Sequence, residues 1–166
     1  MAFGGRQLQL LIAGLVVMLD QATKVAVRSR MDLYETIGLI PGILSLTRVH
    51  NTGAAFGMLN SSDFPYKTVV VGLIATAALS GLAMYAATLD ASQRLSRLGL
   101  ALIIGGAAGN LIDRIAYGYV LDFVDAYYGH WHFWAFNVAD AAISVGVGLM
   151  ILDILGVGRP RVSRAV

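Results

Sequence analysis

The stretch GGAAGNLIDRIAYGYVLDFVDAYYGHWHFWAFNVAD, residues 105–140, decides the fold of this chain. It begins in an apolar helix-forming run that ends in Asn-Leu-Ile-Asp-Arg, passes through a short polar crossing with Asp122, and enters a second apolar run after Phe-Asn-Val-Ala-Asp. Carboxylates, amides and a guanidinium thus lie at the ends of two segments that are apolar enough for a bilayer. Because a charge at the centre of a bilayer helix costs about 2.5–3.5 kcal/mol even by the lower estimates, we expect these groups to carry out chemistry at the membrane surface.

The composition of the whole chain is that of a membrane protein. Of its 166 residues, 57% are hydrophobic and only 13% are charged, whereas about 25% are charged in an average soluble domain. The length fits one domain, residues 1–166. The sequence has no cysteine, which excludes disulfides, thiolate metal ligands and a cysteine nucleophile. The net charge of +2 comes from scattered cations, which favours lipid headgroups over nucleic acid as the partner.

Four apolar runs are long enough to cross a bilayer, which takes about 20 helical residues. They cover residues 8–27, 68–89, 98–115 and 137–155. The first run continues through Asp20 and Lys24 and shows no small-residue cleavage site, so we expect a retained helix rather than a cleaved leader. The spacing of these two charges places them on one helical face, where they can pair.

The connections between the runs predict the orientation in the membrane. Residues 28–66 and 116–136 form two long loops, and the first contains strand-forming sequence over 43–50, followed by the turn-like Asn51-Thr-Gly. The short connection near residue 94 and the C-terminal tail are both basic, so the positive-inside rule places both termini in the cytoplasm. The functional carboxylates then converge on the outer surface, beside the two long loops.

Several common sites are disfavoured by the motifs. Residues 105–109, Gly-Gly-Ala-Ala-Gly, are typical of close helix packing and not of a phosphate loop, because no strand precedes them and no Gly-Lys-Ser/Thr follows. No Gly-x-Ser-x-Gly nucleophile elbow is present. His130-Trp-His132 lacks the His-Glu-x-x-His pattern, and its aromatic neighbours indicate an interfacial belt. We therefore expect neither a metal nor a cofactor.

The aspartates remain as candidate catalytic groups, and their neighbours in the sequence distinguish them. Two aspartates that share one proton divide the work of peptide hydrolysis, since one activates water while the other protonates. Asp20 has a cation one turn away and Asp113 is followed by Arg114, whereas Asp122 and Asp140 have no cation within four residues. We expect Asp122 and Asp140 to be the pair. Spacing alone does not show that they meet, and a purely structural helix N-terminal charge at Asp140 stays open.

Five motifs in order resemble the bacterial lipoprotein signal peptidase family, signal peptidase II. They are Asp20-Gln, Asn51-x-Gly-Ala-Ala-Phe, Gly105-Gly-Ala-x-Gly-Asn-x-x-Asp-Arg114, Val120-x-Asp-Phe and Phe136-Asn-x-Ala-Asp140. The resemblance implies four transmembrane helices, a small extracytoplasmic β-cradle from the first loop, and a periplasmic loop or helix near the site. It also implies an inner-membrane aspartic endopeptidase that cleaves diacylglyceryl-modified prolipoproteins just before the lipidated cysteine.

The resemblance also implies roles for individual residues. By motif position the catalytic pair is Asp122 and Asp140, which agrees with the choice made from their neighbours. The residues implied to bind substrate or shape the site are Asp20, Lys24, Asn51, Gly106, Asn110, Asp113, Arg114 and Asn137. The implied partners are the prolipoprotein substrates and membrane lipids, with a monomeric enzyme. We further expect the small side chains of Gly105, Gly106 and Ala139 to leave room for the substrate helix.

Two other functions stay open at this point. Intramembrane carboxylates also relay protons, so a small proton- or ion-coupled transporter is the main alternative. Its weakness is that the carboxylates gather toward one side and leave the middle of the membrane without a relay. A non-enzymatic assembly factor with glycine-rich helix faces is the second alternative, and it would not need unpaired aspartates at positions 122 and 140.

Overall fold

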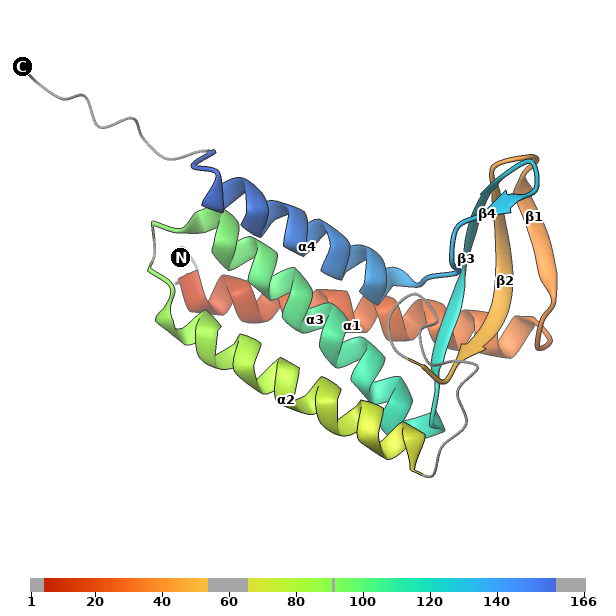
Figure 1. The fold of residues 1–166 in the computed structure, drawn as a ribbon, viewed down its shortest axis with the longest axis horizontal. Coiled ribbons are helices and arrows are strands. Elements are labelled where there is room, and N and C mark those ends of the chain that lie inside the picture. The colour runs from red at the N-terminus through yellow and green to blue at the C-terminus, as the bar shows by residue number, and fades with distance from the viewer. Residues whose placement is uncertain (1–4, 54–65, 91, 158–166) are drawn as a thin grey trace, which may run out of the picture.

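Eight regular elements make up the computed structural model, which describes residues 5–53, 66–90 and 92–157. In chain order they are α1 (Gly5–Arg30), β1 (Thr36–Ile40), β2 (Leu44–Asn51), α2 (Lys67–Thr88), α3 (Arg94–Tyr117), β3 (Val120–Tyr128), β4 (Trp131–His132) and α4 (Val138–Ile154). Figure 1 shows the helices side by side in a bundle, with the strands gathered at one end of it. Each of the four apolar runs forms one of the helices.

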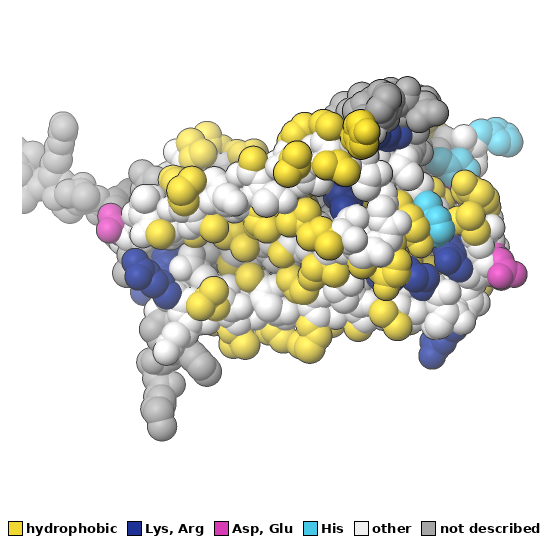
Figure 2. Space-filling view, turned by 90° about the horizontal axis from the view of Figure 1, so that it is seen from below, with side chains coloured by type: hydrophobic (Ala, Val, Ile, Leu, Met, Phe, Trp, Pro, Cys, Tyr) yellow, Lys and Arg dark blue, Asp and Glu magenta, His cyan; other side chains and the backbone are white. Residues whose placement is uncertain are grey.

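The surface of the bundle is that of a membrane protein. Large apolar side chains such as Leu10 on α1 and Leu73 on α2 are exposed along the helices. Figure 2 shows hydrophobic side chains over the middle of the molecule, whereas most charged side chains lie toward its two ends. Within the described residues, α1, α2 and α3 are long and apolar enough to cross a membrane. The helix α4 is shorter, with 17 residues.

The central helix is α3, which packs against all three other helices (Figure 1). Its glycines permit this because a Cβ atom on Gly105 would lie 2.7 Å from the carbonyl oxygen of Ala13 in α1, and one on Gly106 would collide with the carbonyl oxygen of Ala139 in α4. The prediction of close helix packing is therefore confirmed. The expectation that Gly105, Gly106 and Ala139 leave room for a substrate is wrong, since helix backbones fill that space and Ala139 has no exposed surface.

The antiparallel sheet has the order β1-β2-β3-β4 and is built from both loops. The resemblance implies that the β-cradle comes from the first loop, but this loop supplies only the strands β1 and β2. The second loop supplies β3, which pairs with β2 so that Val49 lies opposite Asp122. The described loop residues 31–53 and 118–137 contain no helix. Residues 54–65 lie outside the described residues, so the implied loop helix stays a prediction.

A small apolar core joins the sheet to the bundle. Val27 and Met31, at the end of α1, pack against Leu121 and Phe123 of β3. Because successive side chains of a strand point to opposite faces, Asp122 faces away from this core. The packing of its two neighbours thus determines which way Asp122 points, toward the near ends of α3 and α4.

Candidate active site

The strand β3 presents Asp122 as a buried carboxylate with only 3% of its surface exposed. Its Oδ2 atom accepts a hydrogen bond from Nδ2 of Asn51 at 3.0 Å, and its Oδ1 atom accepts one from Nδ2 of Asn137 at 2.7 Å. Both donors are neutral amides, and the ion pairs found among the described residues do not include Asp122. The carboxylate is therefore held in place without a cation bound to it.

The second carboxylate, Asp140, lies in the first turn of α4. Asn137 caps this helix, because its side chain accepts the backbone N–H of Asp140 at 3.0 Å while Oδ2 of Asp140 accepts the backbone N–H of Asn137 at 3.2 Å. Oδ1 of Asp140 accepts a hydrogen bond from Nδ2 of Asn110 on α3 at 2.8 Å. Asp140 thus has the structural role that the helix-charge alternative gives it. Each carboxylate oxygen has a second lone pair, so this role leaves it able to bind water or a proton.

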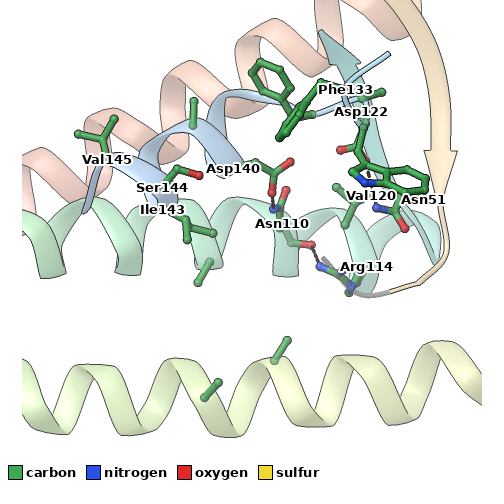
Figure 3. A pocket seen from close by; sticks show the side chains of 17 residues that line it. Asn51, Asn110, Arg114, Val120, Asp122, Phe133, Asp140, Ile143, Ser144 and Val145 are labelled. Carbon is green, nitrogen blue, oxygen red and sulfur yellow. Dashed lines mark hydrogen bonds between the residues drawn. The ribbon is translucent and has the colours of Figure 1, made fainter. Parts of the chain in front are cut away.

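One apolar cavity connects the two aspartates. It has a volume of about 700 Å³, and both Asp122 and Asp140 line it. Figure 3 shows Asp140 of α4 and Asp122 of β3 above α3, which carries Asn110 and Arg114. The remaining lining is mostly alanine, valine, isoleucine and aromatic side chains from α2, α4 and the segment before α4. Both aspartates of the expected pair therefore line one cavity.

The electrostatics of this site favour a retained proton. Burial raises the pKa of Asp122 to about 7, and the nearby negative charge of Asp140 contributes to the rise. The hydrogen bonds from Asn51 and Asn137 act in the opposite direction but do not cancel it. A carboxyl group with such a pKa in a cavity is typical of acid–base catalysis, because it exchanges its proton near neutral pH.

Behind the cavity lies a buried charged cluster. Nζ of Lys24 on α1 lies 2.8 Å from Oδ2 of Asp20 and 3.2 Å from Oδ2 of Asp113, and all three side chains are fully buried. The predicted pair of Asp20 and Lys24 is confirmed. The sequence suggested Arg114 as the partner of Asp113, but Asp113 instead pairs with Lys24 and with Arg28 at 3.3 Å. Adjacent residues of a helix point in different directions, which is why Arg114 does not face it.

This cluster supports the site and does not line the cavity. Oδ1 of Asp20 accepts the backbone N–H of Ala139 at the start of α4, at 3.1 Å. Oδ2 of Asp113 accepts the backbone N–H of Leu121 in β3, at 3.0 Å. Lys24 also donates to Oδ1 of Asn110 at 2.8 Å. The three charged residues thus position the two segments that carry the aspartates.

Arg114 links the first loop to the cavity. Its guanidinium donates to the carbonyl oxygen of Gly53 at 3.0 Å and to the backbone carbonyl oxygen of Asn110 at 3.3 Å, and it lines the cavity beside Asn51. Arg114 thus connects α3 to the described end of the first loop. Residues 54–56 of the Asn51 motif lie outside the described residues.

The sequence reasoning missed some residues that line the cavity. The sequence predicts an interfacial belt at Phe133 and Trp134, and in the structure both also line the cavity (Figure 3 labels Phe133). Ser144 also lines it, and its spacing of four residues from Asp140 was the available signal. The histidines do not gather: His132 lies 3.0 Å from Asp125, and among the described residues no group of three His, Asp or Glu side chains is arranged to hold a metal.

Comparisons with known proteins identify the family of this chain. The sequence matches the family described as Signal peptidase (SPase) II over residues 12–156. It is 46% identical over 139 residues to a lipoprotein signal peptidase of Geobacter sulfurreducens, covering 84% of this chain and 86% of that one. It is 43% identical over 152 residues to one from Symbiobacterium thermophilum, covering 92% of this chain and 97% of that one.

A solved structure shares the fold. It is described as a bacterial membrane enzyme structure obtained by the in meso method at 2.3 Å resolution, and it superposes with a TM-score of 0.79 at 29% identity, covering 95% of this chain and 93% of that one. These matches favour the peptidase over the transporter. The chain belongs to the signal peptidase II family, the aspartic-type membrane peptidases that cleave signal peptides from prolipoproteins.

Proposed function

We propose that Asp122 and Asp140 are the catalytic pair of this peptidase. One observation carries the proposal: two buried carboxylates from different elements are each held by neutral amides and open into the same apolar cavity. A pair so placed shares one proton near neutral pH, because burial disfavours two negative charges at once. The transporter has no comparable support, since the other buried acids near the site are neutralised by Lys24 and Arg28.

The pair hydrolyses a peptide bond by moving protons. The ionised carboxylate takes a proton from water as the water oxygen attacks the scissile carbonyl carbon, and the protonated carboxyl gives its proton to the carbonyl oxygen. The tetrahedral intermediate then collapses. As the C–N bond breaks, one hydroxyl of the diol gives its proton to the ionised carboxylate and becomes the new carbonyl, while the protonated carboxyl gives its proton to the leaving amine. The pair therefore ends with the one proton it held at the start. Asn51, Asn110 and Asn137 keep the two carboxylates oriented throughout.

The proposed substrate is a diacylglyceryl-modified prolipoprotein, cut just before the lipidated cysteine. The named relatives are lipoprotein signal peptidases, and the apolar cavity suits acyl chains and a hydrophobic signal segment. A lipidated chain leaves the bilayer at a cost of about 0.8 kcal/mol per CH₂, so it must be cut where its lipid already lies. The cavity is lined by Ala75 and Ala78 of α2 and by Ala141 of α4, and we infer that the substrate enters sideways between these two helices.

The proposal includes a membrane topology. We infer that the chain is one domain, residues 1–166, with four crossings of the bacterial inner membrane, both termini in the cytoplasm and the site at the outer leaflet. The basic connection before α3 supports this orientation. With 17 residues, α4 extends only about 25 Å, so a fourth crossing requires slight local thinning of the roughly 30 Å hydrocarbon core. We infer that a monomer is active, since both aspartates belong to one chain.

The test is cleavage of a purified diacylglyceryl-modified prolipoprotein in lipid, with a metal chelator present. We expect wild-type protein to cleave, and Asp122→Asn and Asp140→Asn to be folded but at least about a thousand-fold slower, since each removes an acid–base group. Asp125→Asn is the matched control, because it lies on the same strand but bonds to Ser45 and His132 instead of lining the cavity. Full activity in either dyad variant, or a folded wild type that does not cleave, would contradict the proposal.

A further inference from the structure

One polar residue of the cavity stands apart from the catalytic groups. Five of the Asn, Asp, Arg and Ser residues that line the cavity are at its sheet end and hydrogen-bonded to other groups, namely Asn51, Asn110, Arg114, Asp122 and Asp140. The sixth is Ser144, which lies one turn further along α4, among apolar side chains such as Ile143 and Val145 (Figure 3).

The hydroxyl of Ser144 has no hydrogen-bond partner among the residues that the structure describes. Serine and threonine in a helix usually donate to the carbonyl four residues earlier, and two side chains of α2 do so. Thr76 donates to the carbonyl oxygen of Gly72 and Ser80 to that of Thr76, each at 2.8 Å. The side chain of Ser144 is exposed and lines the cavity, so its hydroxyl is accessible to an occupant. Ser144 therefore has a donor available for whatever occupies the cavity.

The substrate brings an acceptor to this place. A signal segment crosses the bilayer as a helix, in which every backbone group is paired. Around the scissile bond the chain must leave the helix so that its carbonyl carbon reaches the two aspartates. The unwound residues then expose carbonyl oxygens inside an apolar cavity, where an unpaired polar group is costly. The amide side chains of Asn51 and Asn110 are already bound to the carboxylates, so they do not meet this need.

The position of Ser144 indicates which carbonyl it meets. Four residues of α-helix separate Asp140 from Ser144, a rise of about 6 Å. An extended chain advances about 3.3 Å per residue, so this distance corresponds to about two substrate residues. The helix α4 runs from the sheet end into the bundle (Figure 1), and the hydrophobic signal segment lies on the bundle side of the scissile bond.

We propose that the Ser144 hydroxyl binds the backbone carbonyl of the signal peptide about two residues N-terminal to the scissile bond. It acts as a positioning contact that holds the unwound segment in register with Asp122 and Asp140. This inference rests on the proposed peptidase function, since it uses the same cavity and the same scissile bond. It predicts a contact with the main chain, and therefore one that does not depend on the substrate side chain at that position.

The first experiment compares Ser144→Ala with Ser144→Thr and with Ser80→Ala. Loss of one neutral hydrogen bond lowers kcat/KM for a lipidated prolipoprotein about three- to ten-fold in Ser144→Ala, whereas Ser144→Thr keeps the hydroxyl and restores most of the rate. Ser80→Ala is the matched control, because Ser80 bonds within α2 and does not line the cavity. It should cleave like wild type. A Ser144→Ala variant with wild-type kcat/KM overturns the inference.

The second experiment changes the substrate and does not depend on how well a variant folds. Lipidated peptides carry a single thioamide, a weaker acceptor than the amide, at the first, second, third or fourth residue upstream of the scissile bond. We expect the wild-type rate to fall at one position near the second residue, and this loss to disappear in Ser144→Ala. Equal rates for all four peptides overturn the inference. It is also overturned if the thioamide lowers the rate of Ser144→Ala by the same factor as it lowers the rate of wild type. A wild type that does not cleave the parent peptide, in which every bond is an ordinary amide, overturns the peptidase function itself.

Discussion

Nδ2 of the fully buried Asn137 lies 2.7 Å from Oδ1 of Asp122, so the residue that caps the helix carrying Asp140 also binds the second aspartate of the cavity. The same amide group lies 3.1 Å from Oδ1 of Asn110 and 3.2 Å from the carbonyl oxygen of Leu121. A single side chain thus contacts α3, β3 and α4 and links the two carboxylates.

Asn137→Ala should lose both stability and activity. The change removes a helix N-cap, which costs about 1 kcal/mol, and leaves buried acceptors unsatisfied, at about 1–3 kcal/mol. We expect the free energy of unfolding, measured by heat or denaturant in detergent, to fall by about 2–4 kcal/mol. The cleavage rate should fall by much more than the unfolded fraction of the variant accounts for. A variant that unfolds early but cleaves at the wild-type rate when folded would show that Asn137 supports only the fold.

The pH dependence of cleavage follows from the shared proton. The pKa of Asp122 is raised to about 7 by burial and by Asp140. Above that pH the pair loses its remaining proton and has no acid for the leaving amine, so kcat should fall as the pH rises beyond about 7. At low pH both carboxyls are protonated and no base remains, so the rate should fall there too. A flat profile from pH 6 to 9 would contradict a proton shared at this pair.

The raised pKa of Asp122 also makes the stability of the fold depend on pH. The dependence is opposite to that of a salt-bridged carboxylate, whose pKa is lowered in the folded state. The native protein holds a proton on Asp122 between its unfolded pKa of about 4 and its folded pKa of about 7, whereas the unfolded chain does not. Stability therefore falls as the pH rises through this window. Asp122→Asn removes this dependence, so its stability relative to wild type should improve between pH 4 and pH 8. Denaturant unfolding at several pH values measures the difference.

Lys24→Met should be one of the most damaging changes in the chain. It leaves the fully buried carboxylates of Asp20 and Asp113 without their shared cation, and removing one partner of a buried ion pair costs about 3–5 kcal/mol. Arg97→Gln is a suitable control, since Arg97 is only partly buried and hydrogen-bonds to Gln9 at the other end of the bundle. We expect a change below about 1 kcal/mol there. Similar unfolding midpoints for Lys24→Met and Arg97→Gln would show that the buried ion pairs of Lys24 do not stabilise the fold.

The features that the sequence predicts well are those determined by local spacing. The lengths of the apolar runs predict the helices, and the spacing of four residues predicts the ion pair of Asp20 and Lys24. The proposed dyad also rests on a local property, because Asp122 and Asp140 lack nearby cations in the sequence. That they share a cavity depends on how α3, α4 and β3 meet, and no spacing along the chain contains that information.

The features that were missed depend on long-range packing. The aspartates of β3 predict a polar crossing, although Val120-Leu-Asp-Phe-Val is rich in the β-branched and aromatic residues that favour a strand. Asp113 was assigned to its neighbour Arg114, but its cation comes from α1. We expect Gly105 and Gly106 to leave room for the substrate, whereas in the structure both lie where α3 packs closely against α1 and α4.

The close approach of α3 and α4 at Gly106 provides a last test of how the site is held. A Cβ atom on Gly106 would collide with the backbone oxygen of Ala139, and backbone has little freedom to move aside. Gly106→Ala should push the start of α4 away from α3, lengthen the contact between Asn110 and Asp140, and destabilise the protein by about 1–3 kcal/mol. Gly72→Ala on α2 is the matched control, because nothing lies within 4 Å of its added Cβ. It should leave cleavage unchanged and be neutral or more stable by up to about 1 kcal/mol. If Gly106→Ala cleaves as fast as Gly72→Ala, the position of Asp140 does not depend on this helix crossing.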